Sequence, residues 1–488
     1  MGKQVDRPAT GIHSSSSLRL TDTMAPSLAL LLWFILLVVL LRFDPARDPK
    51  TSLALWVPVT WMFINESRLP SQWFGGQVGQ AADVLEEGNP LDRSIYLVLI
   101  LLAIGILVSR SFKWNVFFKR NLALTSILVF ALLSVSWSDF PFIALKRWFR
   151  DLGNYLAILV ALSDPRPLEA VRALLRRVHY LLVPLSILLI RYYPQIGKQY
   201  EFWNGADSYV GATTSKNMLG VACLFAGLFF FWDTVARWSD RNQRQTRRII
   251  LVNIAFIAQT LWLLYLSNSA TSRVCLVVGC LVIAGAHSKA SKRHPSFLKW
   301  MIPACVCVYL IAAFCFGLNA QLAGVVGRDP TLTGRTDIWK AVLSTNTNWL
   351  IGVGYESFWL GPRLRLVWSL AGRINEAHNG YLEFYLNQGV IGLCLLGGLL
   401  ISSYMALWRS SAPLAKLASL SLALWTIAVF YNMTEAAFRA PFMCFTFLLG
   451  TLTVPRAATV SPIPSKESSF EGASLLSETR VQSRAIQG

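Results

Sequence analysis

The residues best suited to chemistry in this chain are a histidine and a set of arginines that precede its last apolar segments. His378 is one of 5 histidines among 488 residues, and with Asn379 it stands in a polar stretch that runs into an apolar segment after Gly389 and Gly392. An imidazole titrates near neutral pH and can take a proton from an attacking hydroxyl group. His378 is therefore a candidate catalytic base, and the alternative is a structural histidine bonded to a loop carbonyl.

The spacing around His378 predicts a short helix that begins near Asn375 and ends at Gly389. On such a helix Tyr381 and Tyr385 share the face of His378, at i+3 and i+7. Gly389 stands where glycine commonly ends a helix. We therefore expect His378 and Tyr381 to face the same site.

Arg335 stands at the predicted start of another helix, where Thr333 or Thr336 can cap the backbone. Free N–H groups at a helix N-terminus favour anions. We therefore expect Arg335 to bind a phosphate group. The alternative is an arginine that snorkels to the membrane surface or pairs with Asp337.

Further cations and an amide extend this predicted anion site. Arg273 stands at the mouth of an apolar segment, where an unpaired cation is costly. Lys216 and Asn217 begin another apolar segment, and the alternative is that they only anchor its boundary. Arg363 and Arg365 lie in an otherwise apolar stretch and favour an anionic lipid headgroup or a phosphate.

The composition places these residues in an integral membrane protein. The chain is 54% hydrophobic and 15% charged, with a mean hydropathy of +0.47. Repeated apolar runs of spanning length predict an all-α polytopic membrane protein. The net charge of +19 is explained by lysines and arginines in cytoplasmic loops. A nucleic-acid partner is disfavoured, because no basic stripe interleaves with aromatic residues on a soluble domain.

The apolar runs predict about twelve transmembrane helices. Beyond a first span at Pro26–Leu41, the predicted spans begin near Ile95, Leu122, Leu152, Tyr180, Asn217, Ile250, Val274, Met301, Val390, Leu417 and Phe438. Basic clusters in alternate loops, including Arg172, Arg176 and Arg177, put both termini in the cytoplasm. Ser52–Asn65 is interpreted as a re-entrant or interfacial segment. The alternative is a thirteenth span, which would move the amino terminus outside.

This topology divides the chain into five parts and leaves one long, partly helical periplasmic loop before the last three spans. A loop of that length is usually functional or disordered, and this one is rich in Trp, Tyr, Leu and Gly. The predicted parts are a cytoplasmic tail (1–24), amino-terminal transmembrane helices (25–317), the periplasmic catalytic loop (318–388), carboxy-terminal transmembrane helices (389–455) and a disordered cytoplasmic tail (456–488).

The outer loops show no metal-ligand spacing. They contain no Asp-x-Asp pair and no His-Cys or His-His pair, and their acids are scattered. We therefore expect neither a metal nor another cofactor. A transferase built from these residues would stabilise a diphosphate leaving group with Arg and Lys.

These motifs together resemble the bacterial O-antigen ligases and Wzy-type polysaccharide polymerases. The residues that carry the resemblance are His378-Asn379 with Gly389 and Gly392, Thr333-Gly-Arg335-Thr-Asp-Ile-Trp339, Gly352-Val-Gly354 with Phe358, Lys216-Asn217-Met-Leu-Gly220 and the serine-rich turn at Arg273. Two further stretches are similar to the exopolysaccharide-production branch, namely Trp56-Val-Pro-Val-Thr-Trp61 with Ser67-Arg68, and Trp137-Ser138 with Pro141.

The resemblance implies a metal-independent, inverting glycosyltransferase in the bacterial inner membrane, with its active site facing the periplasm. The implied donor is an oligosaccharide on undecaprenyl diphosphate, and the acceptor is a sugar hydroxyl on a glycan or on lipid A core. Arg273, Arg335 and Lys216 would bind the diphosphate, and His378 would orient or deprotonate the acceptor. Asn217, Arg363, Arg365, Asn379 and Tyr381 would contact the substrates or the membrane lipid.

Three functions remain open at this point. The first is polymerisation of lipid-linked repeat units into exopolysaccharide or O-antigen. The second is ligation of finished glycan to lipid A core or to protein, which needs the same donor site. The third is transport of a lipid-linked or anionic solute, which predicts charged residues buried in mid-span.

Overall fold

The computed structural model describes residues 24–44, 51–75, 88–200, 207–315, 335–408, 417–438 and 441–452. The predicted tails therefore lie outside the described residues, except for Met24, as does the first part of the predicted catalytic loop with Thr333. The helices of the first half are α1 (Pro26–Arg42), η2 (Leu53–Leu55), α2 (Trp56–Glu66), α3 (Pro70–Trp73), α5 (Pro90–Ser109), α6 (Trp114–Arg120), α7 (Leu122–Leu133), η3 (Ser134–Trp137), α8 (Pro141–Leu162), α9 (Pro167–Tyr192) and α10 (Pro194–Gly197).

The second half continues the helical pattern after a small hairpin. Strands β1 (Lys198–Tyr200) and β2 (Asp207–Tyr209) pair antiparallel, with Gln199 opposite Ser208, so the described chain is not wholly α-helical. The remaining helices are α11 (Lys216–Arg237), η4 (Trp238–Asp240), α12 (Arg244–Ser267), α13 (Ala270–His287), α14 (Lys289–Arg293), α15 (Pro295–Cys315), α17 (Arg335–Leu343), α18 (Gly361–Ala371), α19 (Gly380–Leu407), α21 (Ala418–Tyr431) and α22 (Pro441–Thr451).

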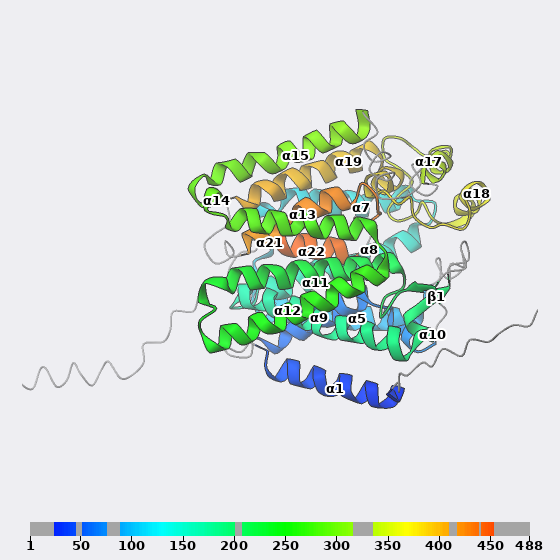
Figure 1. Ribbon diagram of the computed structural model, residues 1–488. Coiled ribbons are helices and arrows are strands. Elements are labelled where there is room, and N and C mark those ends of the chain that lie inside the picture. The colour runs from blue at the N-terminus through cyan, green and yellow to red at the C-terminus, as the bar shows by residue number, and fades with distance from the viewer. Residues whose placement is uncertain are drawn as a thin grey trace, which may run out of the picture.

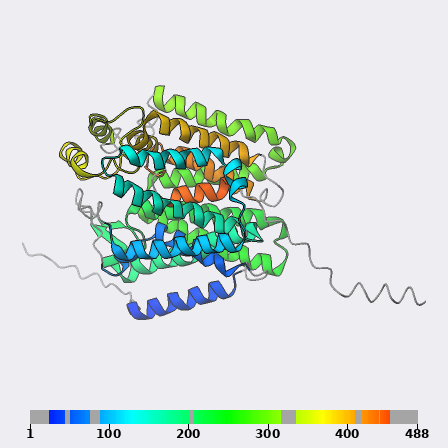
Figure 2. The ribbon, with the colours of Figure 1, turned by 180° about the vertical axis from the view of Figure 1, so that it is seen from behind.

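The long helices lie side by side in one bundle with two distinct ends (Figure 1). The short elements α10, β1, α17 and α18 gather at one end, which we call the loop end, and α14 lies at the other. Arg110 is also at this second end, where it bonds Val160 O at 2.7 Å and Asp164 at 3.3 Å. We call this second end of the bundle, which carries α14, the basic end. Figure 2 shows the bundle from behind, with α7 and α8 on that face.

The length and composition of the helices support a multi-pass membrane protein. Among the described residues, six helices are long and apolar enough to cross a membrane, or seven if the bent pair Trp114–Arg120 and Leu122–Trp137 forms one span. The predicted count of about twelve is therefore not confirmed. Shorter apolar helices such as α1 and α21 lie alongside the six in the bundle.

Helix α1 runs from the loop end to the basic end. Pro26 O accepts a hydrogen bond from the hydroxyl of Tyr193, just past the end of α9, at 3.0 Å. Asp44, two residues past α1, pairs with Arg176 and Arg177. The chain then returns through α2, since Arg68 donates to Ile196 O beside the hairpin. Helix α2 has 11 residues and is not among the helices long enough to cross a membrane, so neither interpretation of Ser52–Asn65 is confirmed.

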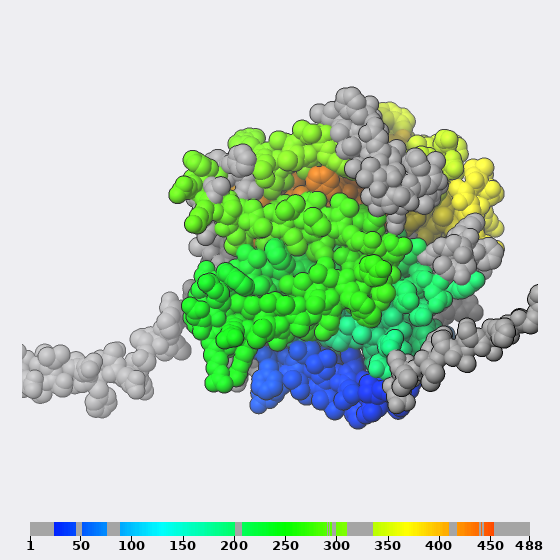
Figure 3. Space-filling view, in the orientation of Figure 1, coloured from blue at the N-terminus to red at the C-terminus, as the bar shows by residue number. Residues whose placement is uncertain are grey.

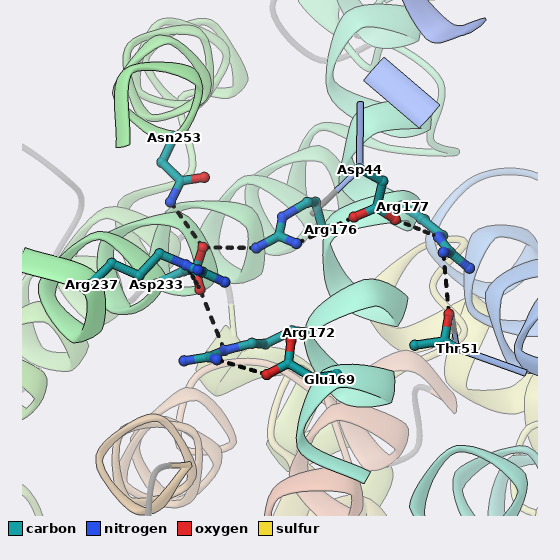
Figure 4. A network of polar contacts seen from close by, with 9 residues as sticks. All are labelled: Asp44, Thr51, Glu169, Arg172, Arg176, Arg177, Asp233, Arg237 and Asn253. Carbon is teal, nitrogen blue, oxygen red and sulfur yellow. Dashed lines mark hydrogen bonds and ion pairs between the residues drawn. The ribbon is translucent and has the colours of Figure 1, made fainter. Parts of the chain in front are cut away.

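The cluster of Arg172, Arg176 and Arg177 was expected in a loop, and that prediction was wrong. All three lie on α9, which begins earlier than the apolar run near Tyr180 suggests. Figure 4 shows Arg176 between Asp233 of α11 and Asp44, with ion-pair distances of 2.8 and 3.4 Å. Arg176 is fully buried, and a buried cation is tolerated when it is paired and hydrogen-bonded.

The centre of the bundle is formed by α11. Its side chains from Leu219 to Phe230, with Trp232, are almost all buried, and it packs against α9, α12, α13 and α21. Helices α12 and α13 form much of the outer surface in Figure 3, where the orange carboxy-terminal helices show only through a narrow gap. An apolar helix that is buried all round fixes its neighbours in place. The loop-end residues are therefore held by a rigid bundle.

Candidate active site

His378 lies immediately before α19, not on a helix as predicted. Its φ of 48° is in the left-handed region, which is uncommon for a residue with a side chain. Asn379 is the N-cap of α19, because its Oδ1 accepts from Tyr381 N at 3.0 Å and from Leu382 N at 3.1 Å. The cap fixes where the helix begins, so His378 and Tyr381 do not share a helical face.

The start of α19 is pressed against the turn that follows α21. Gly380 N donates to Asn432 O at 2.8 Å. A Cβ at Gly380 would overlap Asn432 Oδ1, so only glycine permits this approach. The contact brings the turn 432–435 next to His378.

Two carboxylates lie beside the imidazole of His378, and an arginine pairs with one of them. Its Nδ1 lies 2.9 Å from Glu376 Oε1 and 3.5 Å from Glu435 Oε2. Arg335 pairs with the other oxygen of Glu435 at 2.9 Å and also donates to the carbonyl of Thr434. Glu435 therefore connects the predicted base to the predicted phosphate-binding arginine.

The alternative pairing of Arg335 with Asp337 is not what the structure shows. Asp337 lies 3.7 Å from Lys340, one turn along α17. Arg335 is the first residue of α17, so Thr336 lies inside the helix and is not its N-cap. The prediction that placed Arg335 at a helix start was correct.

The carboxylates control the protonation of His378. Burial lowers the pKa of the imidazole, but the hydrogen-bonding and coulombic effects of Glu376 and Glu435 outweigh burial and raise the pKa to about 10. The imidazole in this arrangement is therefore cationic at neutral pH. It can donate from its ring nitrogens to an anion, and it becomes a base only after losing a proton.

Glu376, His378 and Glu435 could also hold a metal ion, since one ligand atom from each lies within 4.8 Å of the others. The sequence pattern did not reveal this group, because Glu435 is 57 residues from His378 along the chain. However, the guanidinium of Arg335 already occupies one oxygen of Glu435. Glu435 and Glu376 are thus already paired with Arg335 and His378, so we assign the cluster no metal.

Sequence reasoning missed the residue that holds the loop bearing His378. Glu383 is 2% exposed, and its Oε1 accepts from Ala377 N at 2.6 Å. Both of its oxygens also accept from Trp359 Nε1. Trp339 Nε1 donates to Ala377 O at 2.8 Å. Bonds on both sides of Ala377 fix the backbone next to His378.

The two glycine motifs of the resemblance meet at one place. Gly389 has a φ of 64° and marks a kink between two helical parts of α19. The first helical part of α19 thus ends at Gly389, as predicted, but a second helical part follows it. Gly354 N donates to Asn387 O at 2.9 Å, and a Cβ on Gly352 or Gly389 would overlap the facing backbone. The loop 350–354 therefore packs into the kink.

The Trp137-Ser138 motif supports the same loop from the other side. Ser138 Oγ lies 2.7 Å from Ser357 Oγ, and Tyr355 N donates to Ser134 Oγ at 3.0 Å. A Cβ on Gly354 would overlap Ser138. Motifs more than 200 residues apart in the chain thus build one framework.

Arg273 and Lys216 stand at the loop-end starts of α13 and α11. Thr271 Oγ1 lies 3.2 Å from Thr434 Oγ1, so the start of α13 touches the turn that also binds Arg335. Gly220 packs against Ser269 and Ser272, which joins the starts of the two helices. Arg273 donates to Asn268 at 2.7 Å, and its Nε has no hydrogen-bond partner among the described residues.

The other predicted substrate contacts are more dispersed. Arg363 pairs with Asp139 at 2.9 Å and lies over the ring of Phe358, while Arg365 is exposed on α18. The hydroxyl of Tyr381 donates to Val429 O at 3.1 Å, so this side chain bonds to α21. Asn217 lies on the first turn of α11, beside Lys216.

Comparisons with known proteins show what this chain is similar to. Residues 254–397 match the O-antigen ligase family, a region that includes Arg273, Arg335 and His378 but not Glu435. The chain is similar to the exopolysaccharide production protein ExoQ of Rhizobium meliloti (strain 1021), with 26% identity over 287 residues. That alignment spans 57% of this chain and 62% of the relative, so it covers less than two thirds of the relative's length.

Proposed function

We propose, from the similarity of this chain to the O-antigen ligase family and to an exopolysaccharide production protein, that it is a membrane glycosyltransferase whose donor is a polyprenyl-diphosphate-linked oligosaccharide. The observation that carries the proposal is the cluster of Arg335, Glu435, His378 and Glu376 at the loop end of the bundle. The basic end would face the cytoplasm by the positive-inside rule. The cluster would then face the periplasm.

The cations suit a diphosphate leaving group. Arg335 stands at the start of α17, and Arg273 and Lys216 stand at the starts of α13 and α11. Helix N-termini add partial positive charge to these side chains. In the transition state the diphosphate gains negative charge as its bond to the sugar breaks, so cations held beforehand in this position lower the barrier.

The reaction requires one proton transfer. A hydroxyl oxygen of the acceptor forms a bond to the anomeric carbon of the donor sugar, and the bond from that carbon to the diphosphate breaks with its electrons going to the leaving group. The hydroxyl proton passes to the neutral form of His378, which forms when the imidazolium gives up a proton, and Glu376 lies beside that imidazole. Direct displacement inverts the anomeric centre. No described residue needs to become a covalent nucleophile.

We favour polymerisation of repeat units over ligation. The name of the relative, an exopolysaccharide production protein, supports a polymerase. The description of the matching family, O-antigen ligase, supports transfer of finished glycan to lipid A core or to another acceptor. For the transporter alternative, Asp233 and Glu435 lie near or beyond helix ends and are paired. The fully buried pair of Glu66 with His179, which stands in the middle of α9, is a feature that transport would predict.

The test is glycan length in cells that carry the chain with Arg335→Lys. A lysine supplies one point charge and cannot reach Glu435 and the Thr434 carbonyl together. We expect at least a tenfold loss of long glycan, with single repeat units accumulating on the lipid carrier. The matched control is Arg248→Lys, at an exposed position at the basic end.

The species that accumulates distinguishes the two transferases. Single repeat units on the carrier indicate a polymerase, whereas long chains stranded on the carrier indicate a ligase. If Arg335→Lys and Arg248→Lys both leave glycan unchanged while the protein accumulates normally, the proposed donor site is wrong.

A further inference from the structure

The candidate site depends on a carboxylate that stands on a turn and not on a helix. Glu435 lies between α21 and α22, and it is 7% exposed. Its two oxygens approach different partners, Arg335 at 2.9 Å and the imidazole of His378 at 3.5 Å. A side chain on a turn keeps such distances only when supporting contacts hold the turn itself. The residue that holds this turn therefore decides where the carboxylate lies.

The side chain of Asn432 closes the turn that carries Glu435. Its Oδ1 accepts a hydrogen bond from Phe438 N at 2.6 Å, which joins the two ends of the segment 432–438. Its Nδ2 donates to Ala428 O at 2.7 Å. That carbonyl belongs to the last turn of α21, where an α-helix itself supplies no partner. The amide of Asn432 thus closes the turn with one atom and attaches it to α21 with the other.

The main chain of Asn432 binds the other side of the candidate site. Its carbonyl oxygen accepts from Gly380 N at 2.8 Å, and Gly380 lies two residues after His378. Asn432 is 0% exposed, so its hydrogen bonds are shielded from water, where such bonds are weaker. The segment that carries the imidazole and the turn that carries the carboxylate are therefore attached to the same residue.

We propose that Asn432 is a positioning residue, whose side-chain amide holds the Glu435 carboxylate at its distance from the imidazole of His378. The proposal rests on the proposed transferase function, and it gives Asn432 no contact with a substrate. Glu435 is one of three charged groups near the imidazole, since Glu376 approaches from its own loop and Arg335 from α17. Of these three groups, Glu435 alone is carried by the turn that Asn432 closes.

Loss of the side-chain bonds of Asn432 would weaken the contact between Glu435 and His378. Arg335 holds the carboxylate at 2.9 Å and also donates to the carbonyl of Thr434. A loosened turn would therefore stay with Arg335 and give up the longer contact, at 3.5 Å, with the imidazole. Burial lowers the pKa of the imidazole, and Glu435 is one of the two carboxylates that raise it. A change at Asn432 should therefore alter the protonation of His378.

Two variants separate the two bonds of the amide. Asn432→Ala removes both, whereas Asn432→Ser keeps one, because a serine hydroxyl can donate to the carbonyl four residues earlier. The serine variant thus stays attached to Ala428 O and loses the closing bond from Phe438 N. The matched control is Asn154→Ala, which also truncates a buried asparagine but breaks a bond between α8 and Trp61 of α2.

The measurement is the initial rate of glycan extension against pH, with the full chain in lipid nanodiscs and lipid-linked repeat unit as substrate. We expect the midpoint of this profile to fall by about one pH unit in Asn432→Ala and in Asn432→Ser, and to stay in place in Asn154→Ala. When Glu435→Gln is already present, Asn432→Ser should cause no further displacement, because Asn432 acts through that carboxylate. A further displacement beside Glu435→Gln, or an equal displacement in Asn154→Ala, overturns the proposal.

A measurement without turnover separates this proposal from the proposed function. Isotope labelling of the histidines reports the titration of His378 by NMR, with His378→Ala identifying its signal. The midpoint of that titration should fall in Asn432→Ser by the same amount as the midpoint of the rate profile. An unchanged titration in folded Asn432→Ser protein overturns the positioning role. If the wild-type protein extends no glycan while Asn432→Ser still lowers the titration midpoint, the proposed function alone is wrong.

Discussion

At the residue scale, the candidate site depends on the balance of charge among His378, Glu376 and Glu435. A histidine oriented by one carboxylate is a common arrangement for a general base. Here two carboxylates lie near Nδ1 of His378, and Arg335 neutralises the charge of only one of them, Glu435. The second carboxylate makes the imidazolium unusually stable, so the pH dependence of activity reports directly on its role.

If His378 is the base, kcat/KM should rise with pH between 7 and 10. The pKa of the imidazole is raised to about 10, so the deprotonated, active form increases tenfold per pH unit below that value. Glu376→Gln removes one of the raising influences and should move the rise to lower pH. The measurement is the initial rate of glycan extension across this pH range for both proteins.

The opposite profile would assign His378 a different role. A rate that is flat at neutral pH and falls as pH approaches 10 would mean that the imidazolium serves as a cation for the diphosphate. The same raised pKa predicts a stability effect. Its contribution is fully present below the unfolded pKa of about 6.5 and is lost as pH rises through the folded pKa of about 10.

At the element scale, close contacts at glycines set the position of α19. Gly380 touches Asn432 at the start of the helix, and Gly389 faces the loop 350–351 at its kink. The helix is thereby fixed at two points, one on each side of its polar part. This arrangement explains how the stretch from Asn379 to Gly389 positions the loop that carries His378.

Gly380→Ala should disrupt the site, whereas Gly398→Ala should not. The added methyl group at Gly380 overlaps Asn432 Oδ1, while Gly398, on the same helix, has open space around its Cα. We expect Gly380→Ala to lower glycan extension by at least tenfold and to destabilise the protein by about 1–3 kcal/mol. Gly398→Ala should be neutral or stabilising by up to about 1 kcal/mol, because alanine favours helix. Thermal unfolding and glycan length measure both effects, and equal behaviour of the two variants would contradict this account.

The sequence predicted the apolar helices but not the polar contacts that connect them. Apolar runs and their periodicity are local signals, so α11, α12 and α13 begin close to where they were expected. Glu435 and Glu383 were not identified as site residues, because each acts through partners that are distant in the chain. The position of His378 was misjudged for a local reason, since the Asn379 cap stops the helix one residue short of it.

At the scale of the whole molecule, the candidate site at the loop end is balanced by a buried ionic network at the basic end. The carboxylate of Asp233 pairs with Arg176 at 2.8 Å, Arg237 at 3.0 Å and Arg172 at 3.5 Å, and it accepts from Asn253 at 3.0 Å (Figure 4). These residues belong to α9, α11 and α12. The network therefore ties together the same helices whose other ends carry Lys216 and the start of α13.

Asp233→Asn should destabilise the protein far more than any exposed charge change. It leaves Arg172, Arg176 and Arg237 without their shared carboxylate, and breaking a buried ion pair from one side costs about 3–5 kcal/mol. We expect a lower melting temperature and reduced accumulation in the membrane. Asp240→Asn, an exposed aspartate beyond α11, is the control and should be neutral.

Because the network is distant from the His378 cluster, the Asp233→Asn protein that does fold should keep its acceptor KM and its pH profile. A changed pH profile in that variant would show instead that the two ends of the bundle are coupled.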